Sequence, residues 1–254
     1  VWPSGLGCAD PSGPHGESHL DEVSLHEYEA YDHVLVASEK RAEQLRGKCD
    51  VPVEVMLRFS DPSRFFPDRS LAYEKDVLFF GNSGPHCREA AKACIENDID
   101  VSVYGTLWEG IIPESHIRGQ SISQRELRRY YASAKIVLNG HSPSTRESGS
   151  VSNCVCDVGM ARGFLLTDGR YGIDEVFPGG VATYADGEDR KAKCEYYLRH
   201  PDERARIAER LHHLVMEHHT LDHRIRQIEP LLCNGRLEQA SSNDGGGVAW
   251  HASD

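Results

Sequence analysis

The chain has 254 residues, of which 39% are hydrophobic and 27% charged, so a soluble globular protein is expected and a disordered or fibrous one is excluded. Its formal net charge of -12 argues against general binding to nucleic acid or to an anionic membrane, because both would repel an acidic surface. No apolar run approaches the roughly 20 residues that cross a bilayer, and the first residues lack a secretion-signal pattern, so we expect a cytoplasmic protein without a transmembrane segment.

Residues 1–70 predict part of a domain followed by a linker. The segment before Ser18 is rich in glycine and proline, which is typical of a loop or a ragged end. The predicted elements after it are a strand at Asp32–Ala37, a helix from its N-cap Ser38 to Leu45, and a second strand at Val53–Leu57. The polar, proline-containing stretch Asp61–Asp68 then predicts a connection between domains.

Residues 71–233 alternate between short apolar strands and helices. The predicted strands are Val77–Phe80, Val101–Tyr104, Ile136–Leu138 and Phe164–Leu166, and the helices between them are about Pro85–Asn97, Gln124–Ser133 and Val151–Ala161. Amphipathic helices are expected at Arg190–Arg199, Pro201–Glu217 and Asp222–Leu232, and a disordered tail at 234–254. This order predicts an α/β fold with a doubly wound parallel sheet, a partial N-terminal segment and C-terminal helices.

Two loops of this predicted sheet are candidates for binding a ligand. In an open parallel sheet, ligands bind outside the carboxyl ends of the strands, where helix N-termini present unpaired N–H groups to anions. Gly81–Gly84 follows the strand at 77–80, and its small residues allow the backbone to approach a phosphate, with Arg88 one turn into the next helix. A simple tight turn is the alternative interpretation of the same residues.

The second candidate loop, Glu147–Asn153, leads from the strand at 136–138 into the next helix. Its glycine and hydroxyl residues suit a diphosphate at the positive end of a helix. Asp157 lies about one turn further on, where a carboxylate can accept hydrogen bonds from ribose hydroxyls. Helix capping alone is the alternative explanation of a Ser/Gly loop.

Several short motifs occur in a fixed order between residues 19 and 232. They are His19–Ser24, Tyr31–Ser38, Gly81–Ser83, Val103–Gly105 with Trp108–Gly110, Val137–Asn139, the run from Arg146 through Asp157 to Gly163, and His219–Arg224. This order resembles that of the group-1 glycosyltransferases of the spore-maturation, CgeB-like type. The resemblance implies a GT-B fold, in which two Rossmann-like domains face each other and the second holds a nucleotide sugar.

The resemblance also implies an activity and a set of site residues. It implies transfer of a sugar from a nucleoside diphosphate sugar to an unidentified acceptor, without a metal or another cofactor, because helix dipoles and basic side chains stabilise the departing diphosphate. The donor-binding residues that it implies are Gly81, Asn82, Ser83, Tyr104, Ser152, Asn153 and Asp157. The residues predicted to be catalytic are Arg88, Arg146 and Glu147.

The chain departs from the family pattern at two places. The family commonly has Arg directly after the Asn and a bulky residue before the Asp, where this chain has Cys154 and Cys156, so one candidate phosphate contact is absent. The family's Asn-Asp-His is Asn139-Gly140-His141 here. The acceptor-side part, residues 1–70, is also short for a whole domain, so we expect a partner chain or a missing N-terminal domain.

Other interpretations of single residues are weaker. A metal site would use His212, His213, His218, His219 and His223 with Cys154 and Cys156, but no H-E-x-x-H or C-x-x-C motif occurs, which favours structural roles. A nucleophilic cysteine assisted by His141 is disfavoured, and the eight cysteines are expected to be mostly reduced thiols. Trp108 is expected to pack in the core, and Arg125, Arg128 and Arg129 to form the solvated face of a helix.

Two other functions stay open beside the transferase. One is a non-catalytic nucleotide-sugar-binding or scaffold module, which the cysteine at position 154 favours and which would bind a donor without turnover. The other is a sugar-nucleotide epimerase on the same fold. An epimerase needs acid and base groups in the cleft between its two domains, and the sequence identifies no such set.

Overall fold

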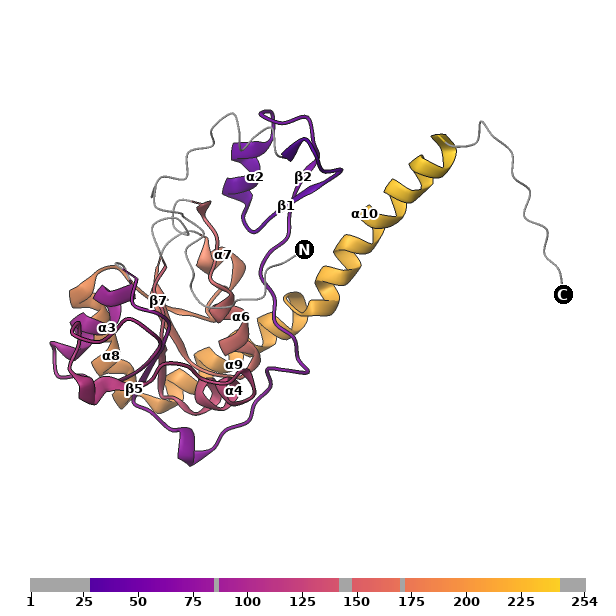
Figure 1. The fold of residues 1–254 in the computed structure, drawn as a ribbon. Helices are drawn as coiled ribbons and strands as arrows, with labels where there is room; N and C mark the ends of the chain where they lie inside the picture. The colour runs from indigo at the N-terminus through magenta and orange to yellow at the C-terminus, as the bar shows by residue number, and fades with distance from the viewer. Residues whose placement is uncertain (1–27, 85–86, 142–147, 170–171, 243–254) are drawn as a thin grey trace.

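The computed structural model describes residues 28–84, 87–141, 148–169 and 172–242, with the side chains of 87–88 and 233–242 not described. Its larger part is a parallel sheet of six strands in the order β5-β4-β3-β6-β7-β8 (Figure 1). The strands are β3 (Val77–Phe80), β4 (Val101–Tyr104), β5 (Ile117–Gly119), β6 (Ile136–Leu138), β7 (Leu165–Asp168) and β8 (Ala182–Tyr184). The chain therefore moves outward from β3 in one direction and from β6 in the other, so the switch point lies between these two strands. The predicted doubly wound parallel sheet is confirmed.

Helices cover both faces of this sheet (Figure 1). They are α3 (Cys87–Ile95), α4 (Gln124–Ser133), α6 (Asn153–Met160), α7 (Ile173–Val176), α8 (Gly187–Arg199) and α9 (Pro201–His218). Helices α3 and α8 contribute to the core on the face where Val77 points, and α4 and α6 to the core on the face where Leu78 points. Both residues are fully buried because successive strand residues point to opposite faces, and both faces are covered.

A smaller unit precedes the sheet. It consists of β1 (Val34–Val36), α2 (Glu39–Leu45) and β2 (Val53–Val55), with β1 and β2 paired in parallel. Ser38 is the N-cap of α2, as predicted, and its Oγ accepts a hydrogen bond from the Arg41 amide at 3.1 Å. The same hydroxyl donates to the Ser148 carbonyl, so the start of α2 contacts the loop that leads into α6.

The linker between the two units is held by the C-terminal helices. It includes the short 3-10 helix η1 (Leu71–Tyr73) before β3. The buried Arg224 of α10 (Leu221–Ser242) donates from Nε to the Leu57 carbonyl at 2.7 Å, and Gln227 Nε2 donates to the Val55 carbonyl at 2.6 Å. The Ser60 amide donates to the His219 carbonyl at 2.9 Å. Helix α10 then continues beyond the body of the molecule (Figure 1).

The structure corrects the sequence analysis at three places. The strands β5 and β8 were not predicted, because β5 includes the exposed Arg118 and β8 includes Thr183, so neither is a continuous apolar run. Helix α10 does not end at Leu232, and residues 234–242, expected in the disordered tail, are helical because good helix formers follow Asn234-Gly235. Arg128 and Arg129 both form ion pairs with Asp68 rather than facing only solvent. Within the described ranges, no helix combines the length and the apolar character that a membrane span requires.

Candidate functional site

Two loops meet at the centre of the carboxyl edge of the sheet, at the switch point. The first, Gly81–Gly84, follows β3, and the second leads from Asn139 after β6 to Ser152, with residues 142–147 outside the described part. A Cβ added at Gly140 would lie 3.7 Å from the Cβ of Ala90 in α3, the helix that follows the first loop. The two segments are therefore neighbours at the crevice where proteins of this topology bind ligands.

The loop after β3 is held by the loop after β4. Asn82 Oδ1 accepts a hydrogen bond from the Thr106 amide at 2.9 Å, and the fully buried Trp108 donates from its indole to the Gly81 carbonyl at 2.8 Å. Gly105 has a φ of +151°, and a Cβ there would lie 2.0 Å from the Gly81 oxygen, so this close approach requires glycine. Trp108 thus packs in the core, as predicted, and helps to fix the loop.

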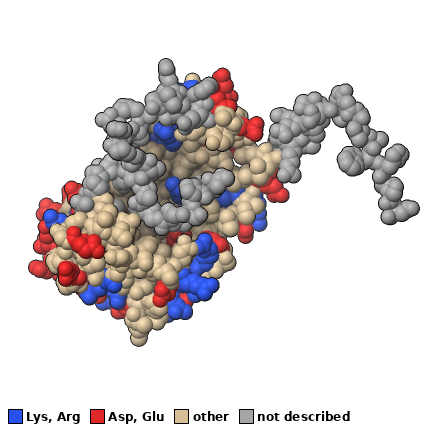
Figure 2. All heavy atoms as spheres, in the orientation of Figure 1, with Lys and Arg blue, Asp and Glu red and all other residues tan. Residues whose placement is uncertain are grey.

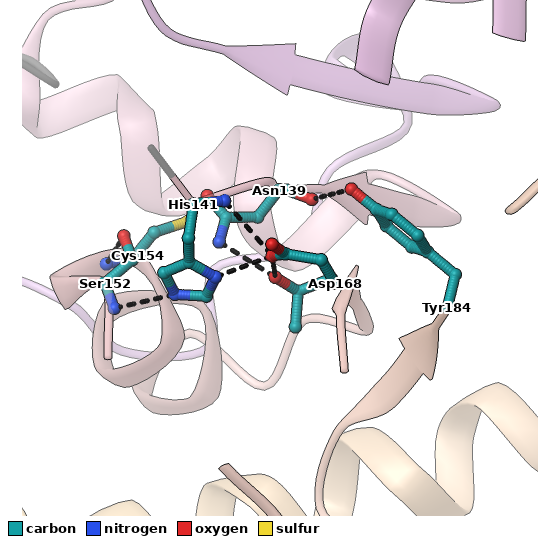
Figure 3. Close-up of polar contacts among 7 residues, drawn as sticks. Asn139, His141, Ser152, Cys154, Asp168 and Tyr184 are labelled. Atoms are coloured by element: carbon teal, nitrogen blue, oxygen red, sulfur yellow. Dashed lines mark hydrogen bonds and ion pairs between the residues drawn. The ribbon is translucent and has the colours of Figure 1, made fainter. Parts of the chain in front are cut away.

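A chain of hydrogen bonds joins the second loop to the end of β7 and to the start of α6 (Figure 3). His141 Nδ1 lies 2.6 Å from Asp168 Oδ1, and the Ser152 amide donates to His141 Nε2 at 3.0 Å. Because a nitrogen that accepts carries no proton, the imidazole is neutral and its proton is on Nδ1, which donates to Asp168. Both side chains are only 4% exposed, so this pair orients the start of α6 from inside the protein.

Further polar groups at the carboxyl ends of three strands support the pair (Figure 3). The His141 amide donates to Asp168 Oδ1 at 3.1 Å, and Asn139 Nδ2 donates to Thr167 Oγ1 at 3.0 Å. The Tyr184 hydroxyl donates to the Asn139 carbonyl at 2.9 Å. The sequence analysis missed Asp168 and Tyr184. The pattern that could have identified them is a polar residue at the carboxyl end of a mostly apolar strand. Asn139, directly after β6, lies at a similar place.

Helix α6 begins at this network and contains a half-buried carboxylate. Ser152 is the N-cap, and its Oγ accepts from the Cys154 amide at 3.3 Å. Asp157 accepts from Ser60 Oγ of the linker at 2.7 Å on one oxygen and from Asn153 Nδ2 at 2.9 Å on the other. Burial raises the pKa of Asp157 to about 6, although both hydrogen bonds oppose the rise. Above that pH the group is a carboxylate with lone pairs left for a further donor.

Comparison of the sequence with known protein families assigns the chain to one of them. Residues 86–230 match the family described as "Glycosyl transferase-like". The chain belongs to this glycosyltransferase family. The spore protein CgeB of Bacillus subtilis (strain 168) is 24% identical over 154 residues, which cover 54% of this chain and 47% of CgeB. The chain thus spans about half the length of that relative, and the predicted CgeB-like resemblance is confirmed.

Solved structures show the same fold. Sucrose-phosphate synthase from Thermosynechococcus elongatus matches with a TM-score of 0.63 at 12% identity, covering 86% of this chain and 63% of that one. Alr3699/HepE of Anabaena, solved in complex with UDP-glucose, matches with a TM-score of 0.63 at 11% identity, covering 84% and 66%. At these identities the likeness concerns the fold alone, and it confirms the expected Rossmann-like fold of a GT-B C-terminal domain.

The structure places most of the predicted donor-binding residues near the two loops. Asn153 and Asp157 are hydrogen-bonded to each other, and Gly81 and Ser83 are buried in the first loop. Tyr104 is also buried, with its hydroxyl 3.2 Å from that of Tyr130, and burial raises its pKa. Its ring therefore belongs to the core beneath the loops. The donor-binding roles of these residues stay predictions.

The predicted catalytic residues cannot be placed in the same way. Arg146 and Glu147 lie outside the described residues, as does the side chain of Arg88, whose backbone belongs to the first turn of α3. Their roles also stay predictions.

The side chains considered for a metal site have separate contacts. No three metal-ligating side chains come together within the part of the chain that the structure describes. His212 Nδ1 lies 3.0 Å from the Gly159 carbonyl, and burial beside the Arg224 guanidinium lowers the pKa of His219 to about 4. Cys156 is fully buried and Cys154 half-buried, as their spacing on a helix predicts.

Proposed function

We propose that this chain transfers a sugar from a nucleoside diphosphate sugar to an acceptor, with the donor bound between the loops after β3 and β6. The observation that carries the proposal is the convergence of these two loops at the switch point, where α6 also begins. The N-terminal end of a helix carries a partial positive charge, which suits a diphosphate. The HepE structure, which contains UDP-glucose, makes a uridine nucleotide the first to test.

In this proposal the residues of the site have distinct roles. The His141–Asp168 pair holds the Ser152 amide and thereby fixes the direction of α6. Asp157 accepts hydrogen bonds from the ribose hydroxyls with the lone pairs that Ser60 and Asn153 leave unused. The departing diphosphate is stabilised by helix amides and basic side chains instead of a metal ion. Arg88, Arg146 and Glu147 act next to the reacting sugar and phosphate.

Calorimetric titration of the whole chain with UDP, GDP and dTDP tests the donor site. We expect one of the three to bind, and Asp157→Ala to weaken that binding by about 1 to 3 kcal/mol, the effect of removing a charged hydrogen-bond acceptor. Asp174→Ala is the matched control, because Asp174 is exposed on α7 and no hydrogen bond or ion pair of it is described. If none of the three nucleotides binds, the proposal is contradicted. If Asp157→Ala binds the nucleotide with unchanged affinity, Asp157 is not part of the site.

Turnover distinguishes the transferase from a binding module. Release of the nucleoside diphosphate from the sugar nucleotide that binds, with and without a chelator such as EDTA, is the direct measurement. The proposal expects a slow release that EDTA does not change and that Glu147→Gln lowers. Tight binding with no release in the presence of a wide set of acceptors would favour the non-catalytic module.

A further inference from the structure

Helix α6 has no positive side chain of its own. Its residues Asn153–Met160 include no Lys or Arg, and the only charged residue is Asp157. The whole chain has a net charge of -12, so an anion is repelled unless cations lie close to where it binds. A diphosphate at this helix therefore needs cations from other elements.

The linker before β3 passes directly over α6. Ser60 Oγ donates to Asp157 at 2.7 Å, and the Ser60 amide is itself fixed by the His219 carbonyl at 2.9 Å. Asp157 is one turn from the first residue of α6, which corresponds to a distance of about 5.4 Å along the helix axis. Residues on either side of Ser60 are thus within the reach of a long side chain from the N-terminal end of the helix.

Two arginines flank Ser60 on this linker, and both are exposed. Arg58 and Arg64 form no ion pair with any residue that the structure describes. Burial raises the pKa of Asp157 and of Cys156, whereas the charge of Arg64 opposes the rise at Asp157 and that of Arg58 opposes it at Cys156. The fields of both guanidinium groups therefore reach α6.

The backbone at both arginines is fixed by buried neighbours. The Arg58 carbonyl accepts from Nη2 of the buried Arg224 at 3.2 Å. Phe65, next to Arg64, is buried and stacks on Tyr131 with ring centroids 6.2 Å apart. The Tyr131 hydroxyl lies 3.8 Å from the Cys154 sulfur in the first turn of α6. Figure 2 shows scattered Lys and Arg atoms among mostly uncharged ones on this face of the molecule.

We propose that Arg58 and Arg64 form a cation pair on the linker that binds the diphosphate of the donor at the start of α6. The inference rests on the proposed function. A guanidinium is suited to this role because it presents several donors in a plane to phosphate oxygens. The linker would then supply the positive charge that this chain lacks at Cys154, where the family commonly has an arginine. The bound donor would contact both the linker and the sheet.

Binding of uridine, UMP and UDP to the full chain by calorimetry tests the pair, with the guanosine or thymidine series used if GDP or dTDP is the nucleotide that binds. We expect Arg58→Gln and Arg64→Gln each to weaken UDP binding about tenfold and to leave uridine binding unchanged, because only UDP has the diphosphate. The losses should shrink at high salt, which screens exposed charges. Arg58→Lys should retain part of the affinity.

Arg125→Gln is the matched control, since Arg125 is an exposed arginine of α4 and the substitution changes the net charge equally. Equal melting temperatures would establish that the variants are folded. If the double variant Arg58→Gln/Arg64→Gln binds UDP as tightly as the unchanged chain, the proposal that the two arginines bind the diphosphate is wrong. The proposed donor site is not contradicted by that result. A chain that binds none of the three diphosphates would overturn both proposals.

Discussion

The neutral imidazole of His141 donates a hydrogen bond from Nδ1 to Asp168 Oδ1 at 2.6 Å. Both side chains are buried, next to the start of α6. Asp168 is the last residue of β7, and His141 follows β6, so the pair ties together the ends of two neighbouring strands. The Ser152 amide completes the chain by donating to Nε2. Stability and donor binding should therefore both depend on Asp168.

Asp168→Ala should destabilise the chain by about 2 to 4 kcal/mol, because it leaves the Nδ1–H and the His141 amide without an acceptor in a buried place. Urea unfolding measures the loss. Asp168→Asn keeps an acceptor oxygen and should recover part of the stability. The exposed Asp174→Ala on α7 is the control, and a loss as small as that of the control would show that the pair is not structurally important.

Asp157 should make stability depend on pH between about 4 and 6. Its pKa rises from the ordinary 3.8 to about 6 on folding, so the folded chain binds more protons in this range and loses stability as pH rises. Asp157→Asn lacks this titration. The stability of the Asn variant relative to the wild type should rise by on the order of 2 kcal/mol from pH 4 to pH 7.

Urea unfolding of both proteins at several pH values measures this difference, and the titrations of all other groups cancel in it. Ser60→Ala should raise the pKa further, because the Ser60 hydrogen bond favours the carboxylate. A difference between wild type and Asp157→Asn that stays constant with pH would contradict the prediction.

Gly105→Ala should be more harmful than a comparable change at another left-handed glycine. A Cβ at Gly105 meets the Gly81 oxygen at 2.0 Å, whereas a Cβ at Gly110, with φ +74°, meets nothing within 4 Å. Gly110→Ala should therefore cost only the backbone strain, about 1 kcal/mol, and Gly105→Ala about 3 kcal/mol or more. Thermal unfolding compares them. Nucleotide binding should weaken only in Gly105→Ala, because the Gly81 loop must move to make room for the added Cβ. Equal losses of stability in the two variants would contradict the prediction.

Ser38→Ala should cost more than the loss of an ordinary helix cap. The Ser38 hydroxyl caps α2 and also donates to the Ser148 carbonyl, far away in the sequence, whereas the Ser123 hydroxyl caps α4 and donates to the exposed Glu126 of the same helix. Each cap is worth about 0.5 to 2 kcal/mol. Ser38→Ala should lose about 1 kcal/mol more than Ser123→Ala in urea unfolding, because the second hydrogen bond of Ser38 is partly buried and joins two segments, whereas that of Ser123 is exposed. Equal losses would show that the contact between α2 and the second loop adds nothing.

Local pattern was sufficient to predict most of the sheet. Val77–Phe80 and Val101–Tyr104 were predicted with the bounds that the structure has, because a buried parallel strand is a continuous apolar run and is easily recognised. Helix α4 was also predicted with its observed bounds, where Ser123 and Glu126 form a capping pair. The short strands β5 and β8 were not predicted, because a polar or charged residue interrupts the apolar residues of each, whereas the equally short β6 is apolar throughout.

The candidate site was predicted only in part. The alternation of strands and helices was enough to locate two loops at the carboxyl edge, since parallel strands all end on the same side. It was not enough to find Asp168 as the partner of His141, or Ser60 as the partner of Asp157, because these pairs are separated by 27 and 97 residues in the chain. Hydrogen bonds between such distant residues depend on the order of strands in the sheet and on the course of the linker. The amino-acid sequence by itself thus determined which segments are strands, helices and loops, through periodicity and capping that act over a few residues. Only the tertiary structure decided which side chains meet, because packing brings together groups whose separation in sequence leaves no local trace.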